Sequence, residues 1–233
     1  LFNGKSKFGI RTGTKPSVKV GAIILDDAHV AFSVVRETFT LAIDKFTEEY
    51  SELTSLFRNA FQEINQIGTF DDILDGVSGG VIEVPYWAWH TQLDAVRQIL
   101  RSISANHPFE WPLLRDNLHL CHAIVSRNSF TITPVLPLVQ EFQTFSECPR
   151  RIYMSATIAD DSEIIQTFDA NVESVCNALT SRSLAGTSER MILIPDLMPF
   201  EFNAFDIVNE LLTSTAKKHN FGSVILVPSN KAA

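Results

Sequence analysis

Residues 21–32 read GAIILDDAHVAF, an apolar run that ends in two adjacent carboxylates, a small residue and a histidine. The run lies in a longer aliphatic and β-branched stretch, 18–27, which has the composition of a buried strand in a parallel sheet. A strand interior does not require Asp26 and Asp27, and a surface turn does not require the apolar residues before them. The stretch therefore predicts an α/β fold in which a strand delivers polar side chains to a sheet edge.

The composition limits the class of protein. The chain has 233 residues, of which 45% are hydrophobic, enough for one large domain or two small ones. It contains no run of about 18 apolar residues, so no membrane span is expected, and its start lacks the apolar region of a signal peptide. Three distant cysteines without a CxxC spacing indicate a reducing, cytoplasmic setting. Because the first residue is not methionine, we expect a fragment of a longer protein.

The charge is distributed unevenly. The net charge of −8 argues against a protein that coats nucleic acid over its whole surface. Residues 1–20, however, contain no acid and five cations: Lys5, Lys7, Arg11, Lys15 and Lys19. Such a basic segment can follow a phosphate backbone, and a solvated basic loop is the alternative interpretation.

A helical region follows the first strand. Apolar residues from Phe39 to Ile67 recur at alternating spacings of four and three, which predicts one long helix of roughly 40 Å that ends near Gly68. A second helix is expected over 91–105, joined to the first through DGVSGG (75–80) and the short strand VIEVP. The aromatic residues of VPYWAWH (84–90) fit the base of this helix pair better than a platform for unpaired bases.

The remaining chain predicts further strands and helices. The segments 118–126 and 129–137 indicate a hairpin, and 148–161 indicates a strand that runs into a polar turn before a helix at 162–168. In LHLCHA, His119 and Cys121 would share one face of a strand, with His122 close by. We favour ordinary strand packing there over a metal pair, because no second ligand cluster exists. A β–α–β order after residue 187 predicts a second α/β unit.

Two strand ends carry the residues suited to chemistry, DDAH (26–29) and SAT (155–157). An acid at such an edge can hold Mg²⁺ through water, and a second acid beside it can orient or deprotonate an attacking water. The alternative interpretations are structural. Acids are favoured at a helix N-terminus, which would explain Asp26 and Asp27, and a capped turn would explain Ser155 and Thr157.

These motifs resemble those of a known family. ILDDAH resembles motif II, the Walker B or DEAD/DEAH box, of superfamily 2 ATP-dependent helicases, and YMSATI resembles their motif III. RMILIPDLMPF and SVILVPSNKAA resemble the opening of the second RecA-like domain. About a hundred residues are inserted between motifs II and III, where some DNA-repair-type members carry a helical arch. The resemblance implies ATP and Mg²⁺ as cofactors, single-stranded DNA or RNA as a partner, and a protein partner for the insertion.

The implied fold is a RecA-like parallel sheet of the P-loop NTPase type with a largely helical insertion. Its parts would be the end of the first RecA-like domain with motif II (1–35), the insertion (36–117), the return to that domain with motif III (118–182), and the start of the second domain (187–233).

The resemblance also implies a role for each site residue. Asp26 would bind Mg²⁺ through water. Asp27 stands where the family usually has glutamate and would position the hydrolytic water. His29 would couple the nucleotide site to motif III or to the second domain, and Ser155 and Thr157 would act as hydroxyl relays.

The tetrapeptide NGKS (3–6) ends like a phosphate-binding loop, but too few residues separate it from Asp26 and no helix pattern follows it. We therefore reject it as the phosphate loop and expect the isolated chain to lack ATPase activity. Two alternatives remain open: a non-catalytic RecA-like scaffold that recruits a protein partner, and a metal-dependent hydrolase that uses Asp26, Asp27 and His29 directly.

Overall fold

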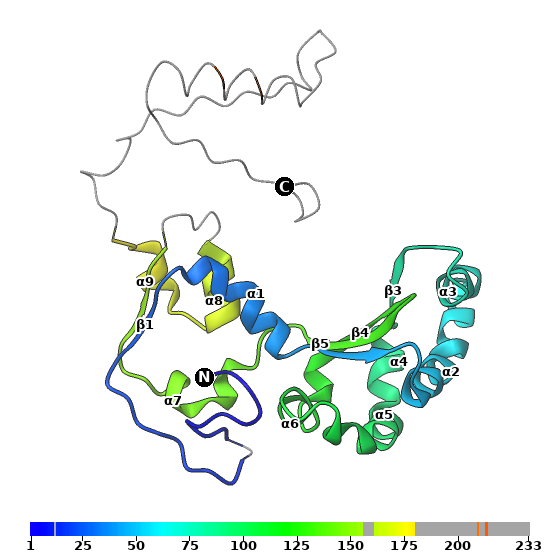
Figure 1. Ribbon diagram of the computed structural model, residues 1–233, viewed down its shortest axis with the longest axis horizontal. Coiled ribbons are helices and arrows are strands. Elements are labelled where there is room, and N and C mark those ends of the chain that lie inside the picture. Colours follow the sequence, from blue (N-terminus) through cyan, green and yellow to red (C-terminus); the bar gives the residue numbers. More distant parts are fainter. Residues whose placement is uncertain (12, 156–160, 180–208, 210–212, 214–233) are drawn as a thin grey trace. The chain divides into compact units, whose positions relative to one another are not determined.

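A computed structural model of the protein describes residues 1–11, 13–155, 161–179, 209 and 213 (Figure 1). Leu1–Ala178 form one compact unit and Leu179–Ala233 a second. The predicted strands and helix of the second α/β unit lie outside the described residues apart from 209 and 213. The first unit is mixed α/β, with one small parallel sheet and one antiparallel sheet.

The parallel sheet contains β1 (Ile23–Leu25) and β6 (Arg151–Tyr153), with Ile24 opposite Ile152. Helix α1 (Ala28–Thr38) follows β1 and helix α8 (Asp161–Phe168) follows β6. The parallel pairing, the strand before SAT and the helix over 162–168 are thereby confirmed. Around them lie the 3₁₀ helix η3 (Val139–Glu141) and the short helices α7 (Gln143–Ser146) and α9 (Val172–Cys176).

A phenylalanine-rich core lies beside this sheet. The rings of Phe32 on α1 and Phe168 on α8 are 5.6 Å apart, and the ring of Phe2 meets those of Phe142 and Phe145 edge-on at 5.1 and 5.0 Å. The N-terminal segment, which forms no helix or strand over the described residues 1–20, is thereby anchored to the core.

The expectation that β1 is buried on both faces is wrong. Side chains alternate along a strand, and Ile23 and Leu25 pack against the phenylalanine core. Ile24 points the other way and is 62% exposed, as is its neighbour Ile152 at 46%. Within the described residues, only one face of this sheet is covered.

An antiparallel sheet in the order β2-β5-β4-β3 joins the expected insertion (36–117) to the segment after it, and residues 41–134 are called the inserted region from here on (Figure 1). Its strands are β2 (Leu41–Asp44), β3 (Val81–Glu83), β4 (Cys121–Ser126) and β5 (Ser129–Pro134). The predicted hairpin is confirmed, because β4 and β5 pair antiparallel with Val125 opposite Phe130. These two strands pair with β2 and β3 rather than with the parallel sheet.

Helices cover one face of the antiparallel sheet. They are α2 (Glu48–Glu63), α3 (Ile67–Leu74), α4 (Tyr86–Thr91), α5 (Leu93–Ile99) and α6 (Trp111–Leu114), with 3₁₀ helices η1 (Leu100–Ala105) and η2 (Leu118–Leu120). The predicted helix over 91–105 is present in the two pieces α5 and η1. No helix of the described residues is long and apolar enough to cross a membrane.

The single long helix predicted over Phe39–Ile67 is wrong. Its first part is strand β2, where Leu41 and Ile43 are buried while Ala42 and Asp44 are exposed, the alternation of a strand rather than a helix. Thr47 then starts α2 as its N-cap, with Oγ1 accepting a hydrogen bond from the Tyr50 N–H. The spacing misled because the four residues from Phe39 to Ile43 are an even spacing, which is compatible with one face of a strand as well as with one face of a helix.

The far end of that predicted helix also differs. Helix α2 stops at Glu63, and Asn65 adopts the left-handed conformation with φ 57°. This conformation is common just past a helix end. Gly68, the expected stop, lies inside the next helix, α3.

The aromatic residues of 84–90 divide between core and surface. Trp89 is buried, stacks on Phe57 with ring centroids 5.8 Å apart, and donates its indole N–H to the Leu118 carbonyl at 2.9 Å. Tyr86 and Trp87 are 76% and 46% exposed. The predicted role in sealing the helical region is therefore confirmed for Trp89 alone.

Candidate functional site at the ends of the parallel strands

The two strand ends singled out in the sequence meet in the structure. Leu25 and Tyr153, the last residues of β1 and β6, are register partners. Beyond them the Met154 N–H donates to the Leu25 carbonyl at 2.8 Å, and the Ala28 N–H donates to the Met154 carbonyl at 2.9 Å. Parallel strands end at the same edge, so the turns that follow them become neighbours.

His29 and Ser155 are brought into direct contact. His29 Nδ1 lies 2.7 Å from Ser155 Oγ, a hydrogen-bond distance in which the tautomer of the imidazole decides which group donates. Both side chains are partly buried. The structure thus joins a residue of the DDAH motif to a residue of the SAT motif, 126 positions apart in the chain.

Asp27 has an unusual backbone. Its φ and ψ are both 47°, in the left-handed region that aspartate enters more readily than most residues. Its N–H donates to Asp26 Oδ1 at 3.0 Å, and both side chains are exposed. The chain thereby turns from β1 into α1 within two residues, and both carboxylates stay at the surface of the sheet edge.

Helix capping does not explain the acid at position 27. Asp27 is the N-cap residue of α1, but its side chain makes no capping hydrogen bond. A capping carboxylate would accept from a backbone N–H two or three residues later. Backbone strain of this kind costs about 1–3 kcal/mol and is concentrated at functional sites. Capping is thereby removed as a reason for the acid, and the interaction of a carboxylate with the N-terminus of α1 is the structural interpretation that stays open beside the functional one.

The structure also bears on the last predicted site residue, Thr157, and on metal binding by the predicted acids. Thr157 lies outside the described residues. Within the described residues, no group of three or more His, Cys, Asp and Glu side chains is arranged to hold a metal ion. This disfavours the hydrolase that would use Asp26, Asp27 and His29 as direct ligands. A Mg²⁺ ion held mainly by water and substrate phosphates needs only one or two protein carboxylates, so Asp26 and Asp27 fit that mode of binding.

Met154 was missed by the sequence reasoning. Its backbone links β1, β6 and α1 through the two hydrogen bonds described above. Its side chain gives no signal of this role. Its position between the strand RIY and the SAT motif is the feature that could have indicated it.

Tyr153, beside this edge, is a structural residue. Its ring stacks on Phe168 with centroids 5.2 Å apart. Burial raises the pKa of the Tyr153 hydroxyl above its ordinary value, and the buried Oη has no hydrogen-bond partner among the described residues.

The His119–Cys121–His122 cluster does not form a metal site. Strand β4 begins at Cys121, so His119 lies in the preceding 3₁₀ helix and does not share a strand face with it. Burial raises the pKa of the Cys121 thiol to about 12, and the thiol donates to the Asn117 carbonyl. His122 instead contacts Glu83, with Nδ1 and Oε1 2.7 Å apart. The expected strand packing is confirmed by burial of Cys121.

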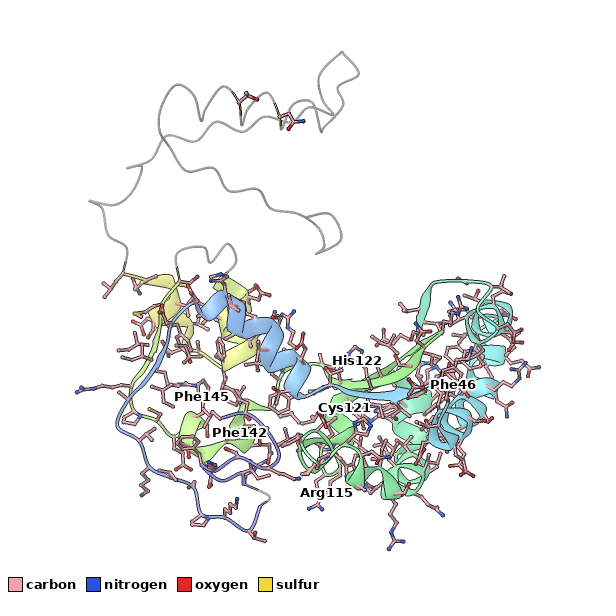
Figure 2. The ribbon with its side chains drawn as sticks, in the orientation of Figure 1. Phe46, Arg115, Cys121, His122, Phe142 and Phe145 are labelled. Carbon is pink, nitrogen blue, oxygen red and sulfur yellow. The ribbon has the colours of Figure 1, made fainter. Side chains whose placement is uncertain are left out.

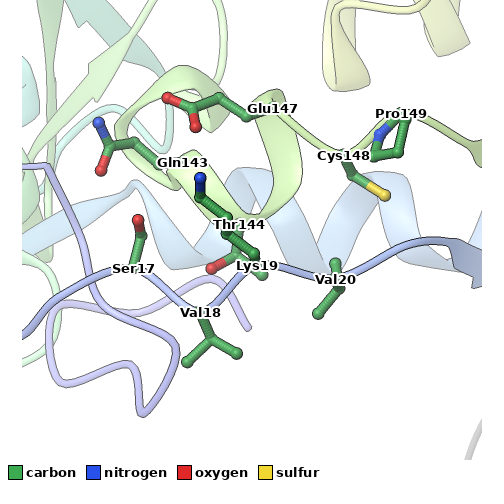
Figure 3. Close-up of a pocket in the computed structure, with 9 residues that line it drawn as sticks. All are labelled: Ser17, Val18, Lys19, Val20, Gln143, Thr144, Glu147, Cys148 and Pro149. Atoms are coloured by element: carbon green, nitrogen blue, oxygen red, sulfur yellow. The ribbon is translucent and has the colours of Figure 1, made fainter.

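A pocket of about 300 Å³ lies elsewhere, between the segment 17–20 on one side and α7 with the residues that follow it on the other (Figure 3). Its charged side chains are Lys19 and Glu147, and none of its nine lining residues belongs to the predicted site. The pocket is therefore separate from the candidate site at the ends of β1 and β6. In the N-terminal segment, no helix follows Ser6 before α1 over the described residues, which agrees with the rejection of NGKS as a phosphate loop.

No family model, curated protein or solved structure matches this chain.

Proposed function

We propose that this chain belongs to an ATP-dependent nucleic-acid helicase or translocase of the superfamily 2 type, with a RecA-like sheet formed around β1 and β6. The observation that carries the proposal is the 2.7 Å contact between His29 Nδ1 and Ser155 Oγ. Two motifs that resemble helicase motifs II and III meet at one edge of a parallel sheet, which is where such folds bind nucleotides. The parallel sheet alone would fit many α/β proteins.

Each residue at this edge has a chemical task in the proposal. Bound Mg²⁺ would neutralise charge on the phosphates of ATP. Asp26 would hold the ion through its water shell, and Asp27 would orient the attacking water or accept its proton. Aspartate is one methylene shorter than the glutamate usual in the family.

His29 and Ser155 would transmit the state of the nucleotide site. Their hydrogen bond joins the first turn of α1 to the segment that follows β6. A change at Asp27, two residues before His29, can therefore reach Ser155 through one side-chain contact. Thr157 would extend this relay along the SAT motif.

A protein-interaction scaffold is the second candidate, and exposed apolar turns on the inserted region favour it. Phe46, which is labelled in Figure 2, is 91% exposed in the β2–α2 turn, and Val77 is 79% exposed in the α3–β3 turn. Lys45 Nζ donates to the Leu74 carbonyl at 3.2 Å, so these two turns lie together. Two exposed apolar side chains on neighbouring turns offer contacts to a protein partner.

The test is ATP hydrolysis by a protein that contains this chain together with a phosphate-binding loop. Removal of a general base costs about 10²–10⁴ in rate, so we expect Asp27→Asn to lower kcat by at least about a hundredfold. Asp72→Asn, an exposed acid on α3, is the matched control and should leave the rate unchanged. The 233-residue chain alone should not turn over ATP. Robust turnover by that chain, or full activity of Asp27→Asn, would contradict the proposal.

A further inference from the structure

A cationic pocket lies in the N-terminal segment, away from the strand-end site. Its volume is about 350 Å³. It combines three cationic side chains with two hydroxyls and several glycines, and no carboxylate is among its lining residues, which are Gly4, Lys5, Ser6, Gly9, Ile10, Gly13, Thr14, Lys15, Pro112 and Arg115. Arg115, at the end of α6, comes from the inserted region (Figure 2).

The backbone that forms the pocket is held in place. The Gly4 N–H donates to the Phe109 carbonyl at 2.8 Å, and a Cβ at Gly4 would lie 2.5 Å from that same oxygen. Gly9 has φ +82°, which a side chain would strain. Arg11 forms an ion pair with the buried carboxylate of Glu141. These contacts fix the segment on both sides of the pocket.

The three cations are available to a ligand. Lys15 is exposed and makes no ion pair or hydrogen bond within the described part of the chain. Arg115 uses Nε to contact Asp116 at 3.1 Å, and its terminal guanidinium nitrogens have no partner among the described residues. The Lys5 ammonium lies 5.2 Å from the centre of the Phe109 ring. Three cations around one hollow, without a lining carboxylate, suit an anion such as a phosphate group.

An exposed aromatic ring stands beside the cations. Phe109 is 47% exposed although its ring contacts Lys5. Sites for single-stranded nucleic acid combine cations along the backbone with aromatic rings on which bases stack. In a duplex the bases are already stacked on each other, so a lone ring of this kind selects single strands.

We propose that this pocket binds a backbone phosphate of single-stranded nucleic acid through Lys5, Lys15 and Arg115, with an adjacent base stacked on Phe109. The proposal rests on the proposed helicase function for its biological role, since it assigns a specific contact to the nucleic-acid partner. The binding itself requires neither ATP nor the carboxylates at 26 and 27.

The test is fluorescence anisotropy of a labelled oligothymidylate titrated with the 233-residue chain. We expect Lys15→Glu, Arg115→Ala and Phe109→Leu each to weaken binding at least about fivefold at low salt. The first two should also reduce the slope of log K against log salt by about 0.7 for each phosphate that is no longer neutralised. Circular dichroism checks the fold, and Lys15→Glu is the safest variant because the Lys15 side chain makes no hydrogen bond or ion pair with the described residues.

Arg127→Ala is the matched control, since Arg127 is an exposed arginine in the β4–β5 turn beside Gly76, outside the pocket. It should leave binding unchanged. Binding that is equally strong in all three pocket variants would overturn the proposal. So would an equal loss in Arg127→Ala, or an equal effect of Phe109→Leu on duplex and single strand. Lys15-dependent binding of inorganic phosphate or ATP, without binding of the oligonucleotide, would also overturn it.

The two proposals can fail separately. Asp27→Asn should bind the oligonucleotide as the unchanged chain does. Lys15-dependent binding, together with no ATPase activity in the protein that also contains a phosphate-binding loop, would refute the helicase and leave the nucleic-acid site established. An active ATPase whose pocket variants bind the oligonucleotide normally would support the helicase and refute the nucleic-acid site.

Discussion

The contact between His29 and Ser155 predicts a measurable coupling energy. A separation of 2.7 Å between Nδ1 and Oγ is that of one well-formed hydrogen bond between partly buried groups. Such a bond contributes about 0.5–1.5 kcal/mol to folding. We therefore expect a double-mutant cycle of His29→Ala and Ser155→Ala to give a coupling of about 1 kcal/mol. The cycle subtracts every other contact of each side chain, so it reports on this pair alone.

The assay is urea unfolding of the purified chain followed by circular dichroism. With a slope of about 1–3 kcal/mol per molar urea, this coupling corresponds to a non-additive midpoint shift of about 0.3–1 M. Ser155→Ala combined with His90→Ala, a histidine on α4 that packs on Tyr86, is the control and should be additive within about 0.5 kcal/mol. A coupling for His29 and Ser155 that is no larger than the control's limit of about 0.5 kcal/mol would refute the contact and remove the main support for the proposed function.

Three further predictions concern the inserted region and the cysteines. Phe57→Ala should lower the free energy of unfolding by about 3–5 kcal/mol, because Phe57 is buried between stacked rings; a decrease of less than about 1 kcal/mol in urea unfolding would contradict the packing. Arg58 holds the pKa of Asp71 below its ordinary value by a hydrogen bond, so the stability that Asp71 contributes is present at neutral pH and disappears as the pH falls below 3.8. Asp71→Asn should accordingly lower the melting temperature slightly at pH 7 and leave it unchanged in strong acid. Iodoacetamide at pH 8 should label the exposed Cys176 quickly and Cys121 at least about a hundredfold more slowly. The reason is that burial raises the pKa of the Cys121 thiol to about 12. Equal labelling rates of the two cysteines, measured by mass spectrometry, would exclude a buried Cys121.

The sequence predicted the parts of the fold that depend on local patterns. Short apolar runs before DDAH and SAT indicated two strands, and the rule that parallel strands end at one edge brought His29 and Ser155 together. The helix predicted to begin at Phe39 was wrong, because the four-residue spacing from Phe39 to Ile43 is compatible with a strand as well as with a helix. Tertiary pairing of β2 with β5 decided between them, and pairing with a strand some ninety residues away leaves no local signal.

The sequence indicated which residues form the candidate site, but it did not indicate their geometry. The left-handed backbone at Asp27 was not foreseen, since aspartate is compatible with several conformations. The approach of Arg115 and Phe109 to Lys5 was not foreseen either. Residues 5 and 109 carry no pattern that relates them, and only the fold of the N-terminal segment against the inserted region joins them.

The strands that lead into and out of the inserted region are neighbours. Leu41 in β2 lies opposite Ile132 in β5, and the hydroxyls of Thr40 and Thr133 are 3.2 Å apart. The intervening chain can therefore be regarded as a cassette whose two ends meet. Proteins accept or lose such cassettes with little disturbance to the host, since the chain can be rejoined across a short gap. A turn linking residues 40 and 133 would excise the region, and the host core around Phe142 and Phe168 would lose only Leu113 among its buried members.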